Sequence, residues 1–181
     1  MRSILSILLS LLFILALSHA QEKIVSSVKG ESSAKYHMSH ALHEIEAISH
    51  DIVYTASIDT SAKTIKSVTA KVDVTTFDSG NSNRDSHAME VIDVLSYPEV
   101  TYASTAVVSS HDTLTVEGKL TFHGVTRSIS SLAVSQWSDK RLVVDATFPI
   151  SLTDFKIERP SLLFIPVSDT LRFSLEAVFQ F

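Results

Sequence analysis

The chain has 181 residues, no cysteine and only four glycines, and its 20 acidic and 15 basic side chains give a formal net charge of −5. The lack of cysteine excludes disulfides, thiolate metal sites and a cysteine nucleophile. The negative charge argues against electrostatic binding to nucleic acid or to anionic lipid surfaces, so no nucleic-acid partner is expected.

The first twenty residues have the pattern of a cleaved secretory signal. Arg2 gives a short positive start, residues 4–17 are almost entirely apolar, and Ser18-His19-Ala20 places small residues at the positions that a signal peptidase reads. The apolar run is short for a membrane span, which needs about 20 residues. We therefore expect an exported, soluble product that begins near Gln21 and has no integral membrane segment after cleavage, lying in the periplasm if the source is Gram-negative.

The region after the signal has an uneven pattern. Residues 21–32 are polar and serine-rich and predict a partly disordered lead-in, while residues 33–181 are long enough for one domain. Residues 34–58 are expected to form two strands with a bend near His43. The only clean alternation within them runs from Ile52 to Ile58.

Four histidines fall in this region, and imidazole together with the carboxylate of Glu44 would suit zinc. On a strand, however, His37 and His43 face one way and His40 the other. The spacing, which continues to His50, also differs from the helical H-E-x-x-H and H-x-x-E-H arrangements. Surface or strand-pairing roles are therefore favoured, and no metal site is expected.

A clear strand follows, and then the period changes. Apolar residues alternate from Val68 to Val74, and turn residues end that strand. Ser82-Asn83-Arg84-Asp85 predicts a helix start, in which Asp85 reaches back to the cap, and Pro98 ends the helical pattern. The apolar face of this short helix of about three turns consists of Ala88, Val91, Ile92 and Leu95.

Alternation then continues to the C-terminus. The predicted strands cover residues 100–108, 114–122, 125–137, 142–152 and 171–181, with short turns between most of them. About eight strands in this order predict an antiparallel meander, which could close into a barrel or form an open sandwich. Residues 153–169 form the one long connection. Their apolar run 162–165, bracketed by Pro160 and Pro166, could be a plug for the core or a lid over a pocket.

Three motifs then carry a resemblance to a known family. The sequence resembles the YceI-like family of secreted bacterial lipid-binding proteins from about Ser33 to Phe181. The motifs, in order, are Asn83-Arg84-Asp85-x-His87, then Tyr97-Pro98-x-Val100-x-Tyr102-x-Ser104, and then Val116-x-Gly118-x-Leu120-Thr121-x-His123-Gly124-Val125-Thr126.

The resemblance implies an all-β fold, a closed eight-stranded antiparallel meander barrel like lipocalins and streptavidin, with one short helix covering part of it. It also implies a hydrophobic ligand, a polyisoprenoid or another long-chain amphiphile, held in the apolar interior for carriage or storage. No cofactor is expected beyond such an isoprenoid lipid or quinone. Two alternatives stay open: a non-enzymatic stress-related or interaction barrel with a packed interior, and, ranked last, a barrel enzyme on a hydrophobic substrate.

Strand faces and motifs together predict the site residues, and no residue is assigned a catalytic role. The predicted barrel interior consists of Val72, Val74, Tyr102, Leu120, Phe122, Phe148, Phe173, Leu175 and Phe179. Such side chains suit the burial of an apolar tail and equally suit a filled core. The candidate contacts at the barrel mouth or with a head group are Arg84, Asp85, His87, His123 and Phe164.

Overall fold

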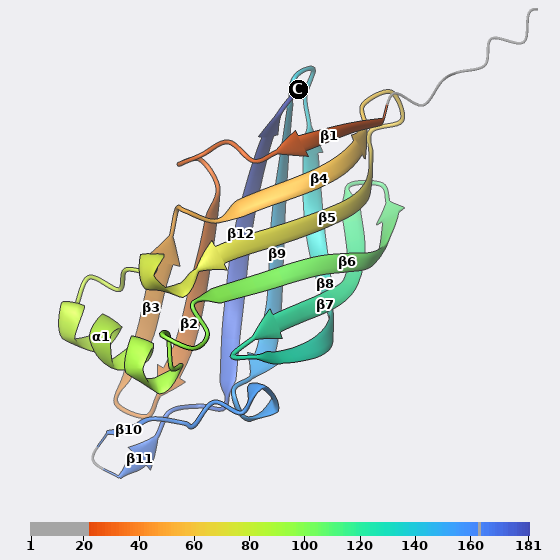
Figure 1. The fold of residues 1–181 in the computed structure, drawn as a ribbon. Coiled ribbons are helices and arrows are strands. Elements are labelled where there is room, and N and C mark those ends of the chain that lie inside the picture. Colours follow the sequence, from red (N-terminus) through yellow and green to blue (C-terminus); the bar gives the residue numbers. More distant parts are fainter. Residues whose placement is uncertain (1–21, 163) are drawn as a thin grey trace, which may run out of the picture.

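The structure is a computed structural model that describes residues 22–162 and 164–181, so the predicted signal lies outside the described residues. One antiparallel sheet of ten strands dominates the fold (Figure 1). Its order is β1-β4-β5-β6-β7-β8-β9-β12-β2-β3. The strands are β1 (Glu22–Ser26), β2 (Ser33–His40), β3 (His43–Ser49), β4 (Val53–Asp59), β5 (Thr64–Asp73), β6 (Glu99–Ser110), β7 (Thr113–Phe122), β8 (Val125–Trp137), β9 (Arg141–Ser151) and β12 (Thr170–Gln180).

The remaining elements are small. A separate hairpin consists of β10 (Ser161–Leu162) and β11 (Ile165–Pro166), and the helices are η1 (Val74–Thr76), α1 (Ser82–Val91) and η2 (Thr153–Phe155). The meander prediction is confirmed from β4 to β9, where each strand pairs with the next along the chain. The β2–β3 hairpin instead joins beyond β12, and β1 joins beyond β4.

The expected count of eight strands is wrong, and the two additional strands come from the N-terminal third. Residues 33–58 form three strands, and the lead-in contains β1. β1 is a short edge strand in which Val25 packs on the core while Ile24 is exposed. Five residues with two apolar side chains show no readable period, so the residue pattern does not reveal this strand.

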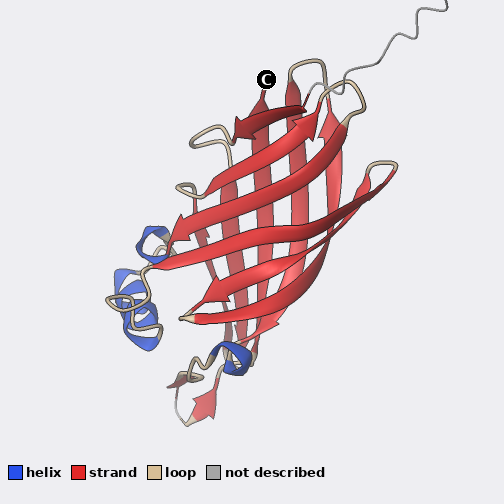
Figure 2. Ribbon diagram, turned by 45° about the vertical axis from the view of Figure 1, so that its right-hand side comes forward, coloured by secondary structure: helices blue, strands red, loops and turns tan. Residues whose placement is uncertain are grey.

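The sheet is strongly curled (Figure 2). The curl brings the edge strands β1 and β3 close to other segments of the chain. Among the described residues the edge strands β1 and β3 do not pair with each other. Next to β1, Ser27 bridges to Phe179 of β12, and the Val28 N–H donates to the carbonyl of Val178 at 2.7 Å. Within β3, Ile48 bridges to Asp78, which lies between η1 and α1, through two hydrogen bonds of 3.0 and 2.9 Å. These isolated bridges fasten the edges in place of continuous strand pairing around a ring.

A bulge in β6 changes which side chains face inward. The β6–β7 register shifts between Ser104 and Ala106, so Val107 packs on the core. Val108, which an unbroken period of two from Tyr102 would turn inward, is 63% exposed. The Ser104 hydroxyl accepts a hydrogen bond from the Val68 N–H at 2.9 Å on the neighbouring strand. A single extra residue reverses a period-two pattern from that point onward.

Helix α1 confirms the predicted helix but differs at both ends. Its N-cap is Asn81, whose side chain accepts from the Arg84 N–H at 3.2 Å, and Asp85 bonds to Ser79 instead of reaching back to the cap. Asp93 adopts a positive φ of 46° after the last helical turn, which takes the chain out of helical phase. Leu95 is therefore 95% exposed, and the apolar contacts come from Val91, Ile92 and Val94.

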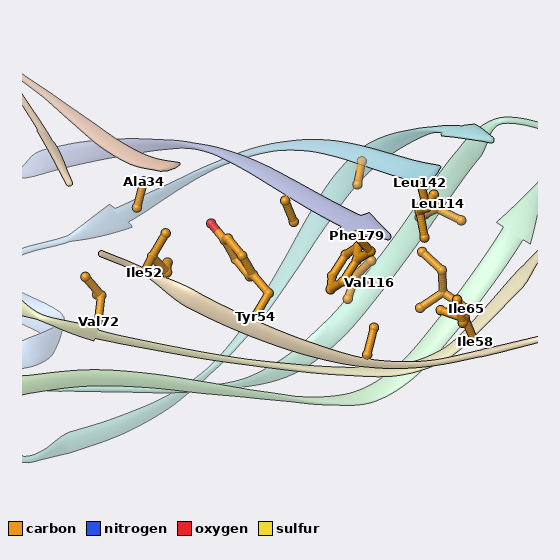
Figure 3. Close-up of a cluster of buried hydrophobic side chains, with 13 residues drawn as sticks. Ala34, Ile52, Tyr54, Ile58, Ile65, Val72, Leu114, Val116, Leu142 and Phe179 are labelled. Atoms are coloured by element: carbon orange, nitrogen blue, oxygen red, sulfur yellow. The ribbon is translucent and has the colours of Figure 1, made fainter. Parts of the chain in front are cut away.

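The buried side chains form two groups inside the curled sheet. The first group includes Tyr54, Leu142 and Phe179 and is shown in Figure 3. The second group includes Phe122, Phe148 and Leu152. Val100, Tyr102 and Leu175 pack against both groups, so the interior is one continuous apolar region.

Candidate functional site

A cavity of about 640 Å³ lies inside the curled sheet. Strands β2 to β9, β12 and helix α1 all contribute to its wall, which consists mainly of aliphatic and aromatic side chains. A volume of this size falls in the range of pockets that hold small organic ligands, about 300–1,000 Å³. The fold therefore encloses space as well as a core.

All nine residues of the predicted interior lie on the wall of this cavity. Phe148 of β9 and Phe173 of β12 are opposite each other in the register and their rings stack at a centroid distance of 5.5 Å. Val74 lies in η1 and not in β5, but it is still buried on the wall. The structure thus brings the predicted set together around one space.

The prediction from strand faces does not include the contribution of β2, β3 and β4. Tyr36, Ile45, Ile52 and Tyr54 lie on the wall. The alternation from Ile52 to Ile58 is a usable signal for Tyr54. Tyr36 is harder to find, because β2 is only half-buried along most of its length and shows weak contrast between its faces.

Two tyrosine hydroxyls are buried on the wall in opposite situations. The Tyr54 hydroxyl donates to the Ser33 carbonyl at 2.9 Å, and burial, with Glu176 as a smaller cause, raises the pKa of Tyr54. The Tyr102 hydroxyl has no hydrogen-bond partner among the residues that the structure describes. Burial, followed by the nearby Glu117 carboxylate, raises the pKa of Tyr102 to about 12.

Gly118 is necessary for the position of Tyr102. A Cβ atom at Gly118 would collide with the Tyr102 ring and with the carbonyl oxygen of Ala103. The ring of Tyr102 therefore occupies the space that a side chain on the neighbouring strand would need. This contact explains the first of the two glycines in the third motif by packing.

A polar cluster lies at the part of the wall formed by α1. Arg84 donates through Nε to the Ser79 hydroxyl at 2.9 Å and through Nη2 to the Ser79 carbonyl at 2.7 Å. Asp85 accepts from the Ser79 N–H at 3.2 Å and from its hydroxyl. Burial raises the pKa of Tyr36, and Asp85 adds to this effect while Arg84 opposes it. Arg84 and Asp85 thus fix the start of α1, and both also line the cavity.

The other three candidate mouth residues lie in different places. His87 lines the cavity, with Nδ1 3.7 Å from a Glu90 carboxylate oxygen. His123 lies outside the cavity wall: its Nδ1 is 3.0 Å from the Phe155 carbonyl, and its ring meets Tyr97 edge-on at 4.6 Å. Phe164 is fully exposed at the tip of the β10–β11 hairpin.

The two histidines of β2 have protein partners. His37 lies 2.9 Å from Glu44 and 3.4 Å from Glu46. His40 accepts from the Leu42 N–H at Nδ1, so Nε2 carries the proton that it shares with the Ile165 carbonyl at 2.9 Å. In the part of the chain that the structure describes, no three histidine, aspartate or glutamate side chains are grouped closely enough to hold a metal ion.

The long connection between β9 and β12 has a buried base and an exposed tip. Phe155, Ile157 and Val167 are buried in the second apolar group. Arg159 donates two hydrogen bonds to the Val167 carbonyl, and the Asp169 carboxylate accepts from Ser151 and Thr153. The base of this segment therefore fills part of the core. Leu163, in the middle of the predicted apolar run, lies outside the described residues.

With the cavity described, comparison with known proteins identifies the family. The model of the YceI-like domain matches residues 25–179. The chain belongs to the YceI-like family. Among curated relatives, a UPF0312 protein of Pseudomonas putida strain GB-1 is 36% identical over 91 residues, which is 45% of this chain and 47% of the relative. Protein YceI of Escherichia coli is 31% identical over 99 residues, 50% of this chain and 52% of that protein. The chain thus spans about half the length of these curated relatives.

Two solved structures share the fold of this chain at low sequence identity. Burkholderia cenocepacia BcnA superposes with a TM-score of 0.76 at 18% identity, covering 84% of this chain and 98% of BcnA. A polyisoprenoid binding domain from Saccharophagus degradans, implicated in plant cell wall breakdown, gives a TM-score of 0.69 at 16% identity, covering 86% and 97% of the two chains. No helix among the described residues is long and apolar enough to cross a membrane.

Proposed function

We propose that this YceI-like protein binds a polyisoprenoid or another long-chain amphiphilic lipid in its interior, as an exported carrier or storage protein. The observation that carries the proposal is the apolar cavity of about 640 Å³ that the nine predicted residues line together. The polyisoprenoid binding domain of Saccharophagus degradans, which has the same fold, supports the choice of ligand class. In this proposal the bridged edges of the sheet make it act as a closed barrel around the chain.

The energetics favour a long apolar chain over a short one. Each CH₂ group moved from water into the cavity contributes about 0.8 kcal/mol, so fifteen such groups contribute about 12 kcal/mol. Association costs roughly 4–15 kcal/mol before any net affinity appears. A ligand with only a few carbon atoms would therefore bind weakly, and affinity should rise with chain length until the cavity is full.

Three polar groups on the wall that are hydrogen-bonded within the protein support binding rather than catalysis. The Tyr54 hydroxyl is bonded to Ser33, and Arg84 and Asp85 are bonded to Ser79. Groups that already satisfy one another within the protein are poorly placed to serve as nucleophile and base for a substrate. The proposed role is therefore non-enzymatic, with export and a periplasmic location as further parts of the proposal.

Native mass spectrometry tests the proposal with a matched pair of variants. Ala146 lines the cavity, whereas Ala103 is exposed on the outer face of the sheet. Protein stripped of lipid should take up a C40 prenol and not a C10 prenol, Ala146→Phe should lose uptake of the long prenol, and Ala103→Phe should keep it. The proposal is wrong if the wild type takes up neither prenol, or if Ala146→Phe loads as well as the wild type.

A further inference from the structure

Four exposed apolar side chains gather at one end of the molecule. Leu42 is 58% exposed in the β2–β3 turn, Leu95 is 95% exposed after α1, and Phe164 and Ile165 are 101% and 41% exposed at the β10–β11 hairpin. We call these four residues the apolar rim. Figures 1 and 2 show that the β2–β3 turn, α1 and the β10–β11 hairpin all lie at the end opposite the C-terminus.

Hydrogen bonds join two of these segments directly. His40, before the β2–β3 turn, contacts the Ile165 carbonyl at 2.9 Å, and the Ser168 N–H donates to the Ser39 carbonyl at 2.7 Å. The hairpin and the turn are thus held side by side. The apolar side chains that they carry form one feature of this end and are not isolated surface residues of the kind that every protein has.

The residues of the apolar rim lie close along the chain to residues of the cavity wall. Leu42 lies between His40 and His43, which both line the cavity. Leu95 follows the wall residue Ile92 by three positions, and Ile165 precedes the wall residue Val167 by two. Each exposed apolar side chain therefore lies within three residues of a wall residue along the chain, so the rim and one part of the cavity wall are built from the same segments.

The backbone presents Phe164 to solvent at a conformational cost. Phe164 has a φ of 65°, in the left-handed region that bulky side chains rarely adopt. Its ring is fully exposed and so gains nothing from packing within the protein. An outward aromatic side chain on a strained hairpin tip is suited to inserting into a surface outside the protein.

The charges near the rim decide between kinds of lipid surface. Glu90, Asp93 and Glu158 lie on the same segments as Lys156 and Arg159, and the chain as a whole carries a formal charge of −5. Arg159 is in addition bonded to the Val167 carbonyl. A rim without an excess of positive charge has no electrostatic attraction for anionic lipids, so apolar insertion must supply the binding.

We propose that the apolar rim docks onto the surface of a zwitterionic phospholipid bilayer. In this proposal docking brings the rim end of the molecule to the bilayer, so that a lipid passes between the bilayer and the cavity without crossing bulk water. This inference rests on the proposed function of the cavity. It adds the surface through which the ligand enters, and the kind of membrane from which it comes.

Tryptophan quenching locates the docked face. Trp137 is the only tryptophan, and it packs beside Phe181 at the C-terminal end with ring centroids 5.9 Å apart. On vesicles of brominated phosphatidylcholine, a double variant that combines Trp137→Phe with Phe164→Trp should be quenched, while the wild type, which reports from Trp137, should not. Equal quenching of the double variant and the wild type, or no quenching of the double variant, would overturn the proposal.

A flotation experiment measures the contribution of the rim. Leu42→Ser, Leu95→Ser and Phe164→Ser together should weaken binding to phosphatidylcholine vesicles by at least about ten-fold. The matched control replaces Ile24, Val108 and Leu132, which are exposed away from the rim, by serine. Unchanged binding of the rim variant, or equal loss in the control, would contradict docking. So would self-association of the wild type that the rim variant lacks, without any vesicle binding.

Loading by two routes separates docking from the cavity's function. A C40 prenol can be supplied from ethanol or from vesicles, and uptake is read by native mass spectrometry. The docking proposal predicts that the rim variant loads normally from ethanol and poorly from vesicles. If the wild type loads from ethanol but does not bind vesicles, docking is wrong while the proposed function stands. Vesicle binding through the rim without loading by either route would support docking and refute the proposed function.

Discussion

Removing the hydroxyl from two wall tyrosines should change stability in opposite directions. The Tyr102 hydroxyl is buried without a partner among the described residues, and the Tyr54 hydroxyl donates to the Ser33 carbonyl at 2.9 Å. A buried unpaired polar group costs about 1–3 kcal/mol, and a satisfied hydrogen bond contributes about 0.5–1.5 kcal/mol. Tyr102→Phe should therefore raise the free energy of unfolding by about 1 kcal/mol, and Tyr54→Phe should lower it by about 1–2 kcal/mol.

The assay is urea unfolding of lipid-free protein, followed by circular dichroism. The two substitutions remove the same atom from the same residue type, so each is the control for the other. A change of about 1 kcal/mol corresponds to roughly 2–4 °C in Tm for a chain of this size. A loss of stability in Tyr102→Phe similar to that in Tyr54→Phe would refute the reasoning, because it would mean that the Tyr102 hydroxyl has a partner in solution.

Single contacts lead to three more predictions. Gly124→Ala should lower stability by about 1–3 kcal/mol in thermal unfolding, because Gly124 has a φ of 69° and a Cβ there would lie 2.5 Å from the Tyr97 ring; unchanged Tm would contradict this. The hydrogen bond from Ser151 lowers the pKa of Asp169 below 3.8. The contribution of the ionised Asp169 carboxylate to folding stability is therefore present above pH 3.8 and is lost as the pH falls through the lowered pKa. Asp169→Asn should accordingly be less stable than the wild type at neutral pH and converge with it in acid, and a constant difference would refute the assignment. The pKa of Tyr102 is raised from 10.0 to about 12, so ionisation of Tyr102 does not change the folding stability below pH 10.0 and lowers it progressively as the pH rises from 10.0 through about 12; an ultraviolet titration in which Tyr102→Phe removes no late-ionising tyrosine would contradict this.

Prediction from the sequence succeeds best where one face of a strand is buried along its whole length. In β7 the burial alternates strictly from Leu114 to Phe122, and the inward residues predicted for β7, β9 and β12 all line one space. That success follows from the period of two, which one buried face imposes on the side chains. Whether the inward side chains fill the space or leave a cavity depends on the distances between facing parts of the curled sheet. The period of two in the sequence gives no information about those distances.

The errors have particular physical causes. β1 is too short to show a period, and the bulge at Ser104 inverts the second half of β6 without any mark in the composition. Leu95 fits the helical spacing but follows Asp93, whose positive φ ends the helix. Each of these features is set by tertiary contacts or by the backbone, and a pattern of residue types does not record them.

The motif residues are easier to recognise than their roles. From the sequence, Arg84 and Asp85 could either fix the helix in place or contact a ligand. In the structure both side chains are hydrogen-bonded to Ser79. His123 is a candidate mouth residue by its motif, but it connects the β7–β8 turn to Phe155 and Tyr97 away from the cavity wall. Partners such as Ser79 and Phe155 come from other loops, so no motif spacing could pair them in advance.

The central claim is that the cavity holds a long apolar chain, and a crystal structure of the protein purified under mild conditions tests it most directly. We predict continuous density of an extended chain in contact with Tyr54, Phe148 and Phe173, with its polar end toward α1. Side chains that close the cavity and leave no space for a chain, or a lipid bound only on the outer face of the sheet, would contradict the claim.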